Sequence, residues 1–356
     1  MNDPRPQLEI LLITDPGFPS RRLGGILDSL DERLNNDLEP DVHLTTRVET
    51  ILMTPHYEID HNSIEAAVDE YDHVDIILVL VEAPRHVNRR PLVAEVFADR
   101  RVAVVCATAV GAIRPNVRIL DTLMSCIERM RPHFLRRDIR QPTLSFCRWS
   151  KNDESGAQML SSSRAAGNVR LLMGMVAAND PWRTMPKLSG VLAGAAAAGA
   201  FGIFYSSIWQ LASYLSTPRL LSIGLMTMVG MVLWLIASHR LWDVPPNESR
   251  ASIVLLYNFS TILTLFACTL GLYIFLVVFI FLGSLVVIDS EYLGLTLDVD
   301  VSITNYLDIA WLSAALGVAA GALGSNFDSD VDVKRLTHGQ RLRQRIATDS
   351  GQGSTD

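Results

Sequence analysis

Two patterns of hydrophobic and polar residues divide the chain near residue 188. Before this point, short apolar runs alternate with stripes of apolar residues at helical spacing. The runs predict buried strands, and the stripes predict amphipathic helices that cover them. The predicted strands are Leu8–Thr14, Val42–Met53, Asp75–Ala83 and Val102–Thr108. The predicted helices are Leu23–Leu38, Ile64–Tyr71, Leu92–Ala98 and Val117–Met130.

Strands that alternate with helices predict βαβ crossovers and a mainly parallel sheet. We therefore expect residues 1–132 to form an α/β doubly wound domain, with helices on both faces of the sheet. Residues 133–187 are polar and basic, and predict a juxtamembrane linker with one helix. No basic segment followed by an apolar one opens the chain, so we predict no signal peptide and a head that stays in the cytoplasm.

After residue 188, four stretches carry no charged side chain: Leu188–Pro218, Leu220–Ser238, Ala251–Ile288 and Ile309–Phe327. A bilayer core about 30 Å thick is crossed by roughly 20 apolar helical residues. A soluble helix has no reason to lack charge on every face. Residues 188–327 therefore predict an all-α transmembrane domain, followed by a polar tail, 328–356. The expected spans are 188–211, 219–238, 258–288 and 308–325.

The third stretch decides the number of spans. As one helix, its 38 residues would measure about 57 Å, too long for one upright span and barely enough for two. Two spans there would give five in total and place the basic tail outside the cell. One span with an interfacial lead-in gives four, and places the acidic segment Asp289–Asp308 outside. Because Lys and Arg favour the cytoplasmic side, we expect four spans in the cell membrane, with head and tail both cytoplasmic.

Charge is distributed unevenly along the chain, whose net charge is −7. Residues 1–130 hold 22 Asp and Glu against 13 Lys and Arg, whereas residues 131–187 hold 10 Lys and Arg against four acids. A basic segment before a span marks a cytoplasmic flank, and it also attracts anionic lipids. The lipid bilayer is thus the expected partner, with anionic lipids reached through residues 131–187. An acidic head gives no reason to expect nucleic-acid binding.

Ligands of open α/β sheets bind beyond the carboxyl ends of the strands. Polar and cationic residues gather there, and cationic side chains beside a helix N-terminus suit an anion such as a phosphate. Alternatively, the arginines belong to a solvated loop or face lipid phosphates. The candidate ligand-binding residues are Thr14, Asp15, Ser20, Arg21, Arg22, Glu82, Arg85, Arg89, Arg90 and Thr108.

Other chemistry finds little support in the sequence. There is no G-x-G-x-x-G and no G-x-x-x-x-G-K-[ST], so no nucleotide cofactor is predicted. A cluster of His56, Glu58, Asp60 and His61 lacks the H-E-x-x-H spacing and Cys partners, so no metal site is predicted. The four cysteines form no C-x-x-C pair and fit a reducing compartment. An acid/base pair of Asp15 and Glu82 would require an edge that excludes water.

Small residues indicate how the spans pack. The pairs Gly190/Gly194 and Gly317/Gly321 each form a G-x-x-x-G, which lets helix backbones approach closely. The pattern does not distinguish packing within one chain from a homo-oligomer or a membrane protein partner. It also arises readily in any span rich in Ala and Gly.

Several segments resemble a group of uncharacterised actinobacterial integral membrane proteins, which have an N-terminal α/β head and C-terminal transmembrane helices. The resemblance rests on Thr14–Pro19, on Val74–Ile76 with Glu82–Pro84, on Arg90–Val96 and on Gly321–Ser325. In that group the exit of the third strand more often reads Asp-Leu-Pro, which puts a role for Glu82 in doubt. The group has no established activity, so the resemblance implies an architecture and a cell-envelope setting.

Three hypotheses about function follow. The first is a membrane-anchored sensor, scaffold or regulatory protein, whose head binds a small anionic ligand or a protein partner. The second is a transporter or a transporter subunit, and the third is a membrane-bound enzyme that acts at the strand ends of the head. Because no catalytic motif is present, the first is preferred and catalytic residues are not assigned.

Overall fold

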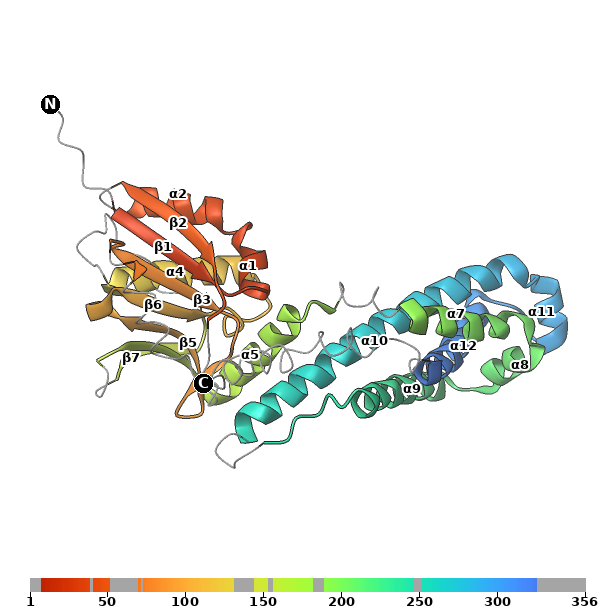
Figure 1. The fold of residues 1–356 in the computed structure, drawn as a ribbon. Coiled ribbons are helices and arrows are strands. Elements are labelled where there is room, and N and C mark those ends of the chain that lie inside the picture. The colour runs from red at the N-terminus through yellow and green to blue at the C-terminus, as the bar shows by residue number, and fades with distance from the viewer. Residues whose placement is uncertain are drawn as a thin grey trace, which may run out of the picture. The chain divides into compact units, whose positions relative to one another are not determined.

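The computed structural model describes residues 8–38, 41–51, 70–71, 73–130, 144–152, 156–181, 189–245 and 251–324. The chain divides into two compact units, a head that ends at Ala178 and a helical unit that begins at Asn179. The head contains a sheet with helices packed on it, and in the described residues of the helical unit the regular structure is all helical (Figure 1). The predicted α/β head followed by a helical domain is thus confirmed at this level.

One half of the sheet in the head is parallel. Strands β1 (Leu8–Thr14), β2 (Val42–Val48), β3 (Ile76–Val81) and β6 (Val102–Cys106) lie in the order β2-β1-β3-β6 and all run the same way. The three inner strands are apolar runs whose residues are almost all buried, as expected for strands covered on both faces.

Four further strands make the sheet mixed rather than mainly parallel. Beyond β6 come β5 (Arg90–Phe97), β8 (Gln158–Ser162) and β7 (Cys147–Lys151), each antiparallel to its neighbour, and the short β4 (Arg85–Val87) pairs with β5. The prediction of a helix at Leu92–Ala98 is wrong, because β6 and β8 pair with this segment from both sides. The predicted head boundary at residue 132 is also too early, since β7 and β8 complete the same sheet.

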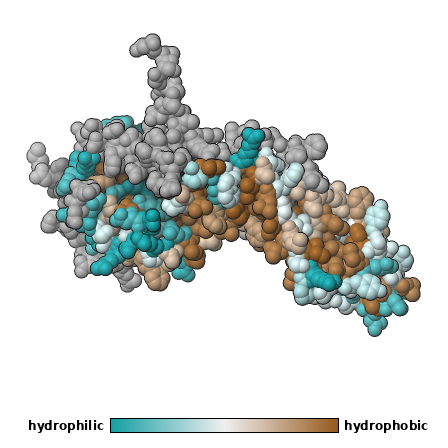
Figure 2. Space-filling model, turned by 90° about the horizontal axis from the view of Figure 1, so that it is seen from below, coloured by the Kyte–Doolittle hydropathy of each residue, from teal (hydrophilic) through white to brown (hydrophobic). Residues whose placement is uncertain are grey.

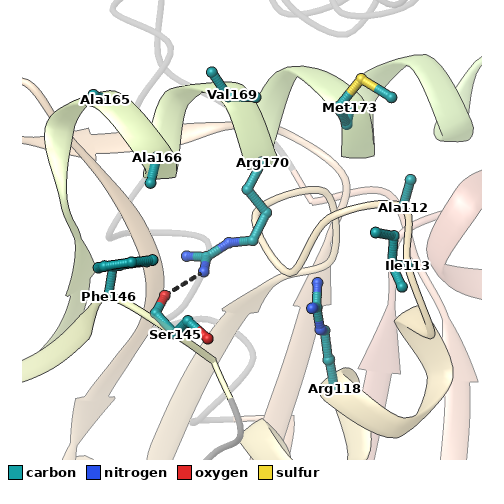
Figure 3. Close-up of a pocket in the computed structure, with 10 residues that line it drawn as sticks. All are labelled: Ala112, Ile113, Arg118, Ser145, Phe146, Ala165, Ala166, Val169, Arg170 and Met173. Carbon is teal, nitrogen blue, oxygen red and sulfur yellow. Dashed lines mark hydrogen bonds between the residues drawn. The ribbon is translucent and has the colours of Figure 1, made fainter.

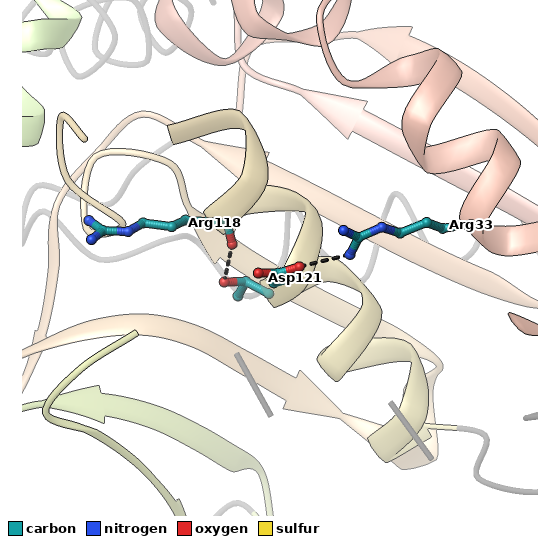
Figure 4. A network of polar contacts seen from close by, with 4 residues as sticks. Arg33, Arg118 and Asp121 are labelled. Carbon is teal, nitrogen blue, oxygen red and sulfur yellow. Dashed lines mark hydrogen bonds and ion pairs between the residues drawn. The ribbon is translucent and has the colours of Figure 1, made fainter. Parts of the chain in front are cut away.

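Four helices pack on the sheet: α1 (Phe18–Leu23), α2 (Leu27–Asp37), α4 (Pro115–Met130) and α5 (Arg164–Ala178). The apolar stripe of α4 is buried, from Ile119 to Met130. Arg33 of α2 pairs with Asp121 of α4 at 2.7 Å and links the two helices (Figure 4). A predicted helix over residues 64–71 falls mostly outside the described residues.

The helical unit contains α7 (Ser189–Phe204), α8 (Ser206–Tyr214), α9 (Thr217–Ser238), α10 (Ala251–Val287), α11 (Ser290–Leu297) and α12 (Ile303–Gly324). By length and composition, α9, α10 and α12 are each able to cross a membrane. Their apolar side chains cover the outside of the unit, whose visible face is mostly hydrophobic, while that of the head is mostly hydrophilic (Figure 2).

The first predicted span, 188–211, is not one straight helix. Helices α7 and α8 meet at an angle of 85°, so they count as a fourth span only if the bent pair is taken together. Tyr205 is extended at the bend, and the indole N–H of Trp209 donates to the Gly202 carbonyl at 2.9 Å. Trp209 also meets Tyr292 of α11 edge-on at 5.9 Å, so α8 and α11 lie at the same end of this unit.

The third charge-free stretch forms a single helix. All 37 residues of α10 are helical, about 55 Å at 1.5 Å per residue, so the predicted lead-in before residue 258 is a continuation of the same helix. The segment after it begins with the short helix α11. Asp289 caps α11 by accepting the N–H groups of Glu291 and Tyr292 at 2.9 and 3.1 Å.

Candidate functional site

One carboxylate and one hydroxyl tie the carboxyl ends of β1, β3 and β6 together. Asp15, which follows β1, is 1% exposed. Its Oδ1 accepts the Ile51 N–H at 3.2 Å, and its Oδ2 accepts the Glu82 N–H at 3.0 Å. Thr108, which follows β6, donates its hydroxyl to the Glu82 carbonyl at 3.1 Å. Asp15, Glu82 and Thr108 are therefore brought together as predicted, and they fasten the strand ends to one another.

The remaining polar candidates after β1 make local hydrogen bonds. Thr14 donates its hydroxyl to the Arg47 carbonyl at 3.3 Å. The Ser20 hydroxyl accepts the Gly17 N–H at 3.0 Å and donates to the Gly17 carbonyl at 3.2 Å, which closes the turn that starts α1. Gly17 has φ of 117°, a conformation open to glycine and strained for other residues.

The two arginines of α1 are bound within the head. Arg21 Nη2 donates to the Ala178 carbonyl at 2.9 Å, at the end of α5. Arg22 lies over the Phe18 ring, with its guanidinium carbon 5.0 Å from the ring centre. Both cations therefore serve the packing of α1 in this conformation.

The other three arginines belong to the β4–β5 hairpin. Arg85 forms a largely buried ion pair with Glu95 of β5. Arg89 lies in the turn with φ of 61°, and both Arg89 and Arg90 are exposed. The five predicted arginines thus divide among α1, an internal ion pair and a hairpin tip, and do not converge on one anion site.

Helix α5 packs on the edge where an α/β sheet usually binds its ligand. At Gly174 a Cβ would lie 1.9 Å from the Thr108 carbonyl oxygen, so only glycine allows this approach. Arg170 Nε donates to the Ala109 carbonyl at 3.0 Å, in the loop that follows β6. The other nitrogens of Arg170 donate at 2.9 Å to the Ser145 carbonyl, Cys147 Sγ and Ser162 Oγ. The helix of the predicted linker is therefore part of the head.

A groove of about 510 Å³ runs along the outer side of α5. Arg170 and Arg118 reach into it from α5 and α4 (Figure 3), and Arg118 Nη1 also donates to the Val110 carbonyl at 2.9 Å. Its remaining walls are apolar or small side chains, chiefly Ile113, Phe146, Ala165, Ala166, Val169 and Met173. One signal in the sequence is Arg170, a cation that directly precedes the apolar run from Leu171 to Ala178.

Burial shifts the pKa of several groups in the head. Burial lowers the pKa of His86, whose Nε2 lies 3.2 Å from Asn168 Oδ1 of α5. Burial also raises the pKa of the Cys106 thiol, and raises that of Cys126 to about 12. Both thiols are therefore protonated at neutral pH, and a protonated thiol is a poor nucleophile.

The predicted packing glycines lie on α7 and α12. A Cβ at Gly317 would come within 2.4 Å of the Ala195 carbonyl oxygen, so α12 approaches α7 closely there. Gly194 faces open space, Gly321 is buried, and Gly190 lies in the first turn of α7. Gly202, which the G-x-x-x-G pattern did not predict, makes a closer contact, since a Cβ there would lie 1.8 Å from Ser313 Oγ of α12.

Within the part of the chain that is described, no three His, Cys, Asp or Glu residues are grouped to hold a metal ion. The cluster from His56 to His61 lies outside the described residues. No family model, curated protein or solved structure matches this chain. Functional conclusions therefore depend on the geometry of the head and of the helices.

Proposed function

We propose that this chain is a multi-pass membrane protein whose α/β head is a cytoplasmic regulatory or scaffold module. The observation that supports this most strongly is the position of α5. It packs on the carboxyl edge of the head's own sheet, and the chain then leads directly into the helical unit. Because α5 both packs on the sheet and continues into the helical unit, the head is suited to transmit a conformational change to the membrane helices.

The proposal favours a protein partner over a small anionic ligand at the strand ends. Asp15, Thr108 and Arg21 are committed to hydrogen bonds inside the head. An enzyme at this edge would need the same groups free to meet a substrate. Arg89 and Arg90 instead stand exposed at the hairpin tip, where an acidic protein surface would find two cations.

The proposed topology has four crossings, made by α9, α10, α12 and the bent pair of α7 and α8 taken as one span. Helices α8 and α11 then both lie at the far end, which agrees with the contact between Trp209 and Tyr292. The loops at this end, 205–216 and 288–302, carry no Lys or Arg, whereas residues 131–187 carry ten. This asymmetry supports a topology in which the head and the tail are both cytoplasmic.

A transporter remains the second hypothesis, but the polar groups of α10 offer it little support. The Asn258 side chain accepts the Asp243 N–H at 3.0 Å and donates to the Asp243 carbonyl at 2.9 Å. Asn179 donates to Thr264 Oγ1 at 2.9 Å. These hydrogen bonds hold connecting segments against α10, a role that accounts for Asn258 and Thr264 in an apolar helix.

Gly174→Val tests the coupling between the head and the membrane helices. A side chain at this position collides with the Thr108 backbone and should release α5. We expect faster amide hydrogen exchange in α5 and, if the head regulates the membrane unit, in α7 as well, for the full chain in lipid nanodiscs. Gly24→Ala is the matched control, because a Cβ there meets no atom within 4 Å. Faster exchange in α5 with no change in any membrane helix would contradict the regulatory role.

A ligand titration distinguishes a head that binds a protein partner from a head that binds a small anion at the strand ends. Millimolar inorganic phosphate or a nucleotide should leave the thermal midpoint of the full chain unchanged, because the candidate arginines do not converge. A saturable rise of the midpoint, abolished by Arg21→Gln, would instead restore the anion site at the strand ends.

A further inference from the structure

The outer side of α5 is an exposed apolar surface, which we name the α5 face. Its most exposed members are Phe146, Ile113 and Val169, with 74%, 70% and 63% of their surface exposed, and Met173 is also exposed. These residues come from three separate segments that meet along the groove of Figure 3. Exposed apolar patches of this kind mark interaction sites.

The segments that form the α5 face are uniformly basic. Residues 109–118, 144–151 and 164–178 contain six Lys or Arg and no Asp or Glu. Four of these cations, Arg114, Arg148, Lys151 and Arg164, are exposed. Apolar side chains among cations, without acids, suit the boundary between anionic head groups and acyl chains.

Phe146 adds a second indication that the α5 face has a role beyond folding. It has φ of 62°, a backbone region that bulky residues rarely occupy, and yet its ring is exposed. Neither burial nor backbone preference accounts for an aromatic residue at this position. An aromatic ring at a membrane interface would account for it.

The covalent link keeps the α5 face near the membrane. Ten residues, 179–188, connect α5 to α7, and ten residues span at most roughly 35 Å. A surface held this close needs only weak intrinsic affinity, because the tether supplies a high effective concentration. The same tether makes the bilayer a more accessible occupant than a soluble partner.

We propose that the α5 face docks on the anionic cytoplasmic surface of the bilayer in which the chain is anchored. Phe146, Ile113, Val169 and Met173 enter the interface, and Arg114, Arg148 and Arg164 meet lipid phosphates. This inference rests on the proposed membrane anchoring and adds a second, reversible attachment of the head.

The test uses the full chain in nanodiscs, with lipids that carry a nitroxide quencher near the top of the acyl chain. A bimane label is placed at Val169→Cys in a Cys147→Ser background, since the other three cysteines are buried. Val48→Cys is the matched control, an exposed valine on the edge strand β2. Val278→Cys, an exposed position on α10, reports insertion of the helices.

We expect strong quenching at residues 169 and 278 and little at residue 48, with more quenching at residue 169 in anionic than in zwitterionic lipid. Phe146→Asn should lower the quenching at residue 169 without unfolding the head, because Asn tolerates positive φ. Neutralising Arg148 and Arg164 to Gln should weaken docking about fivefold per charge in anionic lipid only.

Two results would overturn the inference, and they are distinguishable. In the first, residue 278 is quenched but residues 169 and 48 are equally little quenched. The protein is then inserted in the membrane, and its α5 face is free or is covered by another part of the chain or by a second copy. No quenching at residue 278 would refute the membrane anchoring itself, and the docking proposal with it.

Discussion

Replacing Asp15 by Asn tests the interpretation that this carboxylate fastens the strand ends of the head. Each carboxylate oxygen accepts one backbone N–H, from Ile51 and from Glu82. Asn offers one carbonyl oxygen and places an amide group opposite the other N–H. One charge-assisted hydrogen bond is lost and buried donors are left facing each other.

The magnitude follows from burial, because Asp15 is 1% exposed and water cannot replace the lost acceptor. A charge-assisted bond contributes about 1.5–3 kcal/mol and an unsatisfied buried donor costs about 1–3 kcal/mol. Since these costs overlap, we expect a net loss of about 2–4 kcal/mol. In a domain of this size the thermal midpoint then falls by roughly 5–15 °C.

The assay is thermal unfolding of the full chain in detergent, with Asp75→Asn as the matched control. Asp75 accepts the Glu9 N–H through one oxygen at 3.0 Å and is partly exposed. Asn keeps that single acceptor, so this change should cost less than about 1 kcal/mol. If Asp15→Asn and Asp75→Asn unfold at the same temperature, the fastening role of Asp15 is refuted.

Two further predictions concern packing and pH. Gly202→Ala should destabilise the helical unit by about 1–3 kcal/mol, because its Cβ would lie 1.8 Å from Ser313 Oγ. Gly194→Ala is the control and should be neutral, because a Cβ there meets open space. The thermal aggregation midpoints of the two variants in detergent are compared, and equal midpoints would exclude a tight contact at Gly202. Burial lowers the pKa of His86 below 6.5, so the unfolded head binds more protons between the folded pKa and 6.5. The contribution of neutral His86 to the free energy of unfolding of the head should therefore be fully present above pH 6.5 and decrease as the pH falls below 6.5. His86→Gln should flatten that decline in thermal unfolding scans at pH 5.5–7.5, and an unaltered decline would assign it to other groups.

Parts of the fold that depend on local pattern were predictable. Buried strands such as Leu8–Thr14 and the stripe that became α4 have strong periodicity, and charge-free stretches identify apolar helices whatever their tertiary contacts. At Leu92–Ala98 the local pattern is not sufficient, because a short apolar run fits either a helix or a strand. Its partners β6 and β8 decided the outcome, and β8 comes from a segment that looks like a linker.

The candidate site shows a different limit. The rule for open sheets correctly grouped Asp15, Glu82 and Thr108 at one edge. It could not predict that α5 packs on this edge, because that depends on the absence of a side chain at Gly174. It also treated Arg21 and Arg85 as available, although Ala178 and Glu95 bind them in the folded head.

The length of α10 bears on how the chain meets the bilayer. At about 55 Å, this helix exceeds the roughly 30 Å hydrocarbon core, so it must tilt or extend beyond it at one end. Its polar residues are concentrated before residue 270, from Tyr257 to Thr269. We therefore expect the amino-terminal part of α10 to leave the hydrocarbon on the side of the head.

The most direct test of the proposed account is the sidedness of two sites in living cells. Alkaline phosphatase, which is active only outside the cytoplasm, would be fused after Asp298 and, separately, after Asp356. Four crossings predict an active enzyme at Asp298 and an inactive one at Asp356, with the reverse pattern for a fluorescent protein that matures only in the cytoplasm. An active phosphatase after Asp356, or an inactive one after Asp298, would contradict a topology in which head and tail share the cytoplasm.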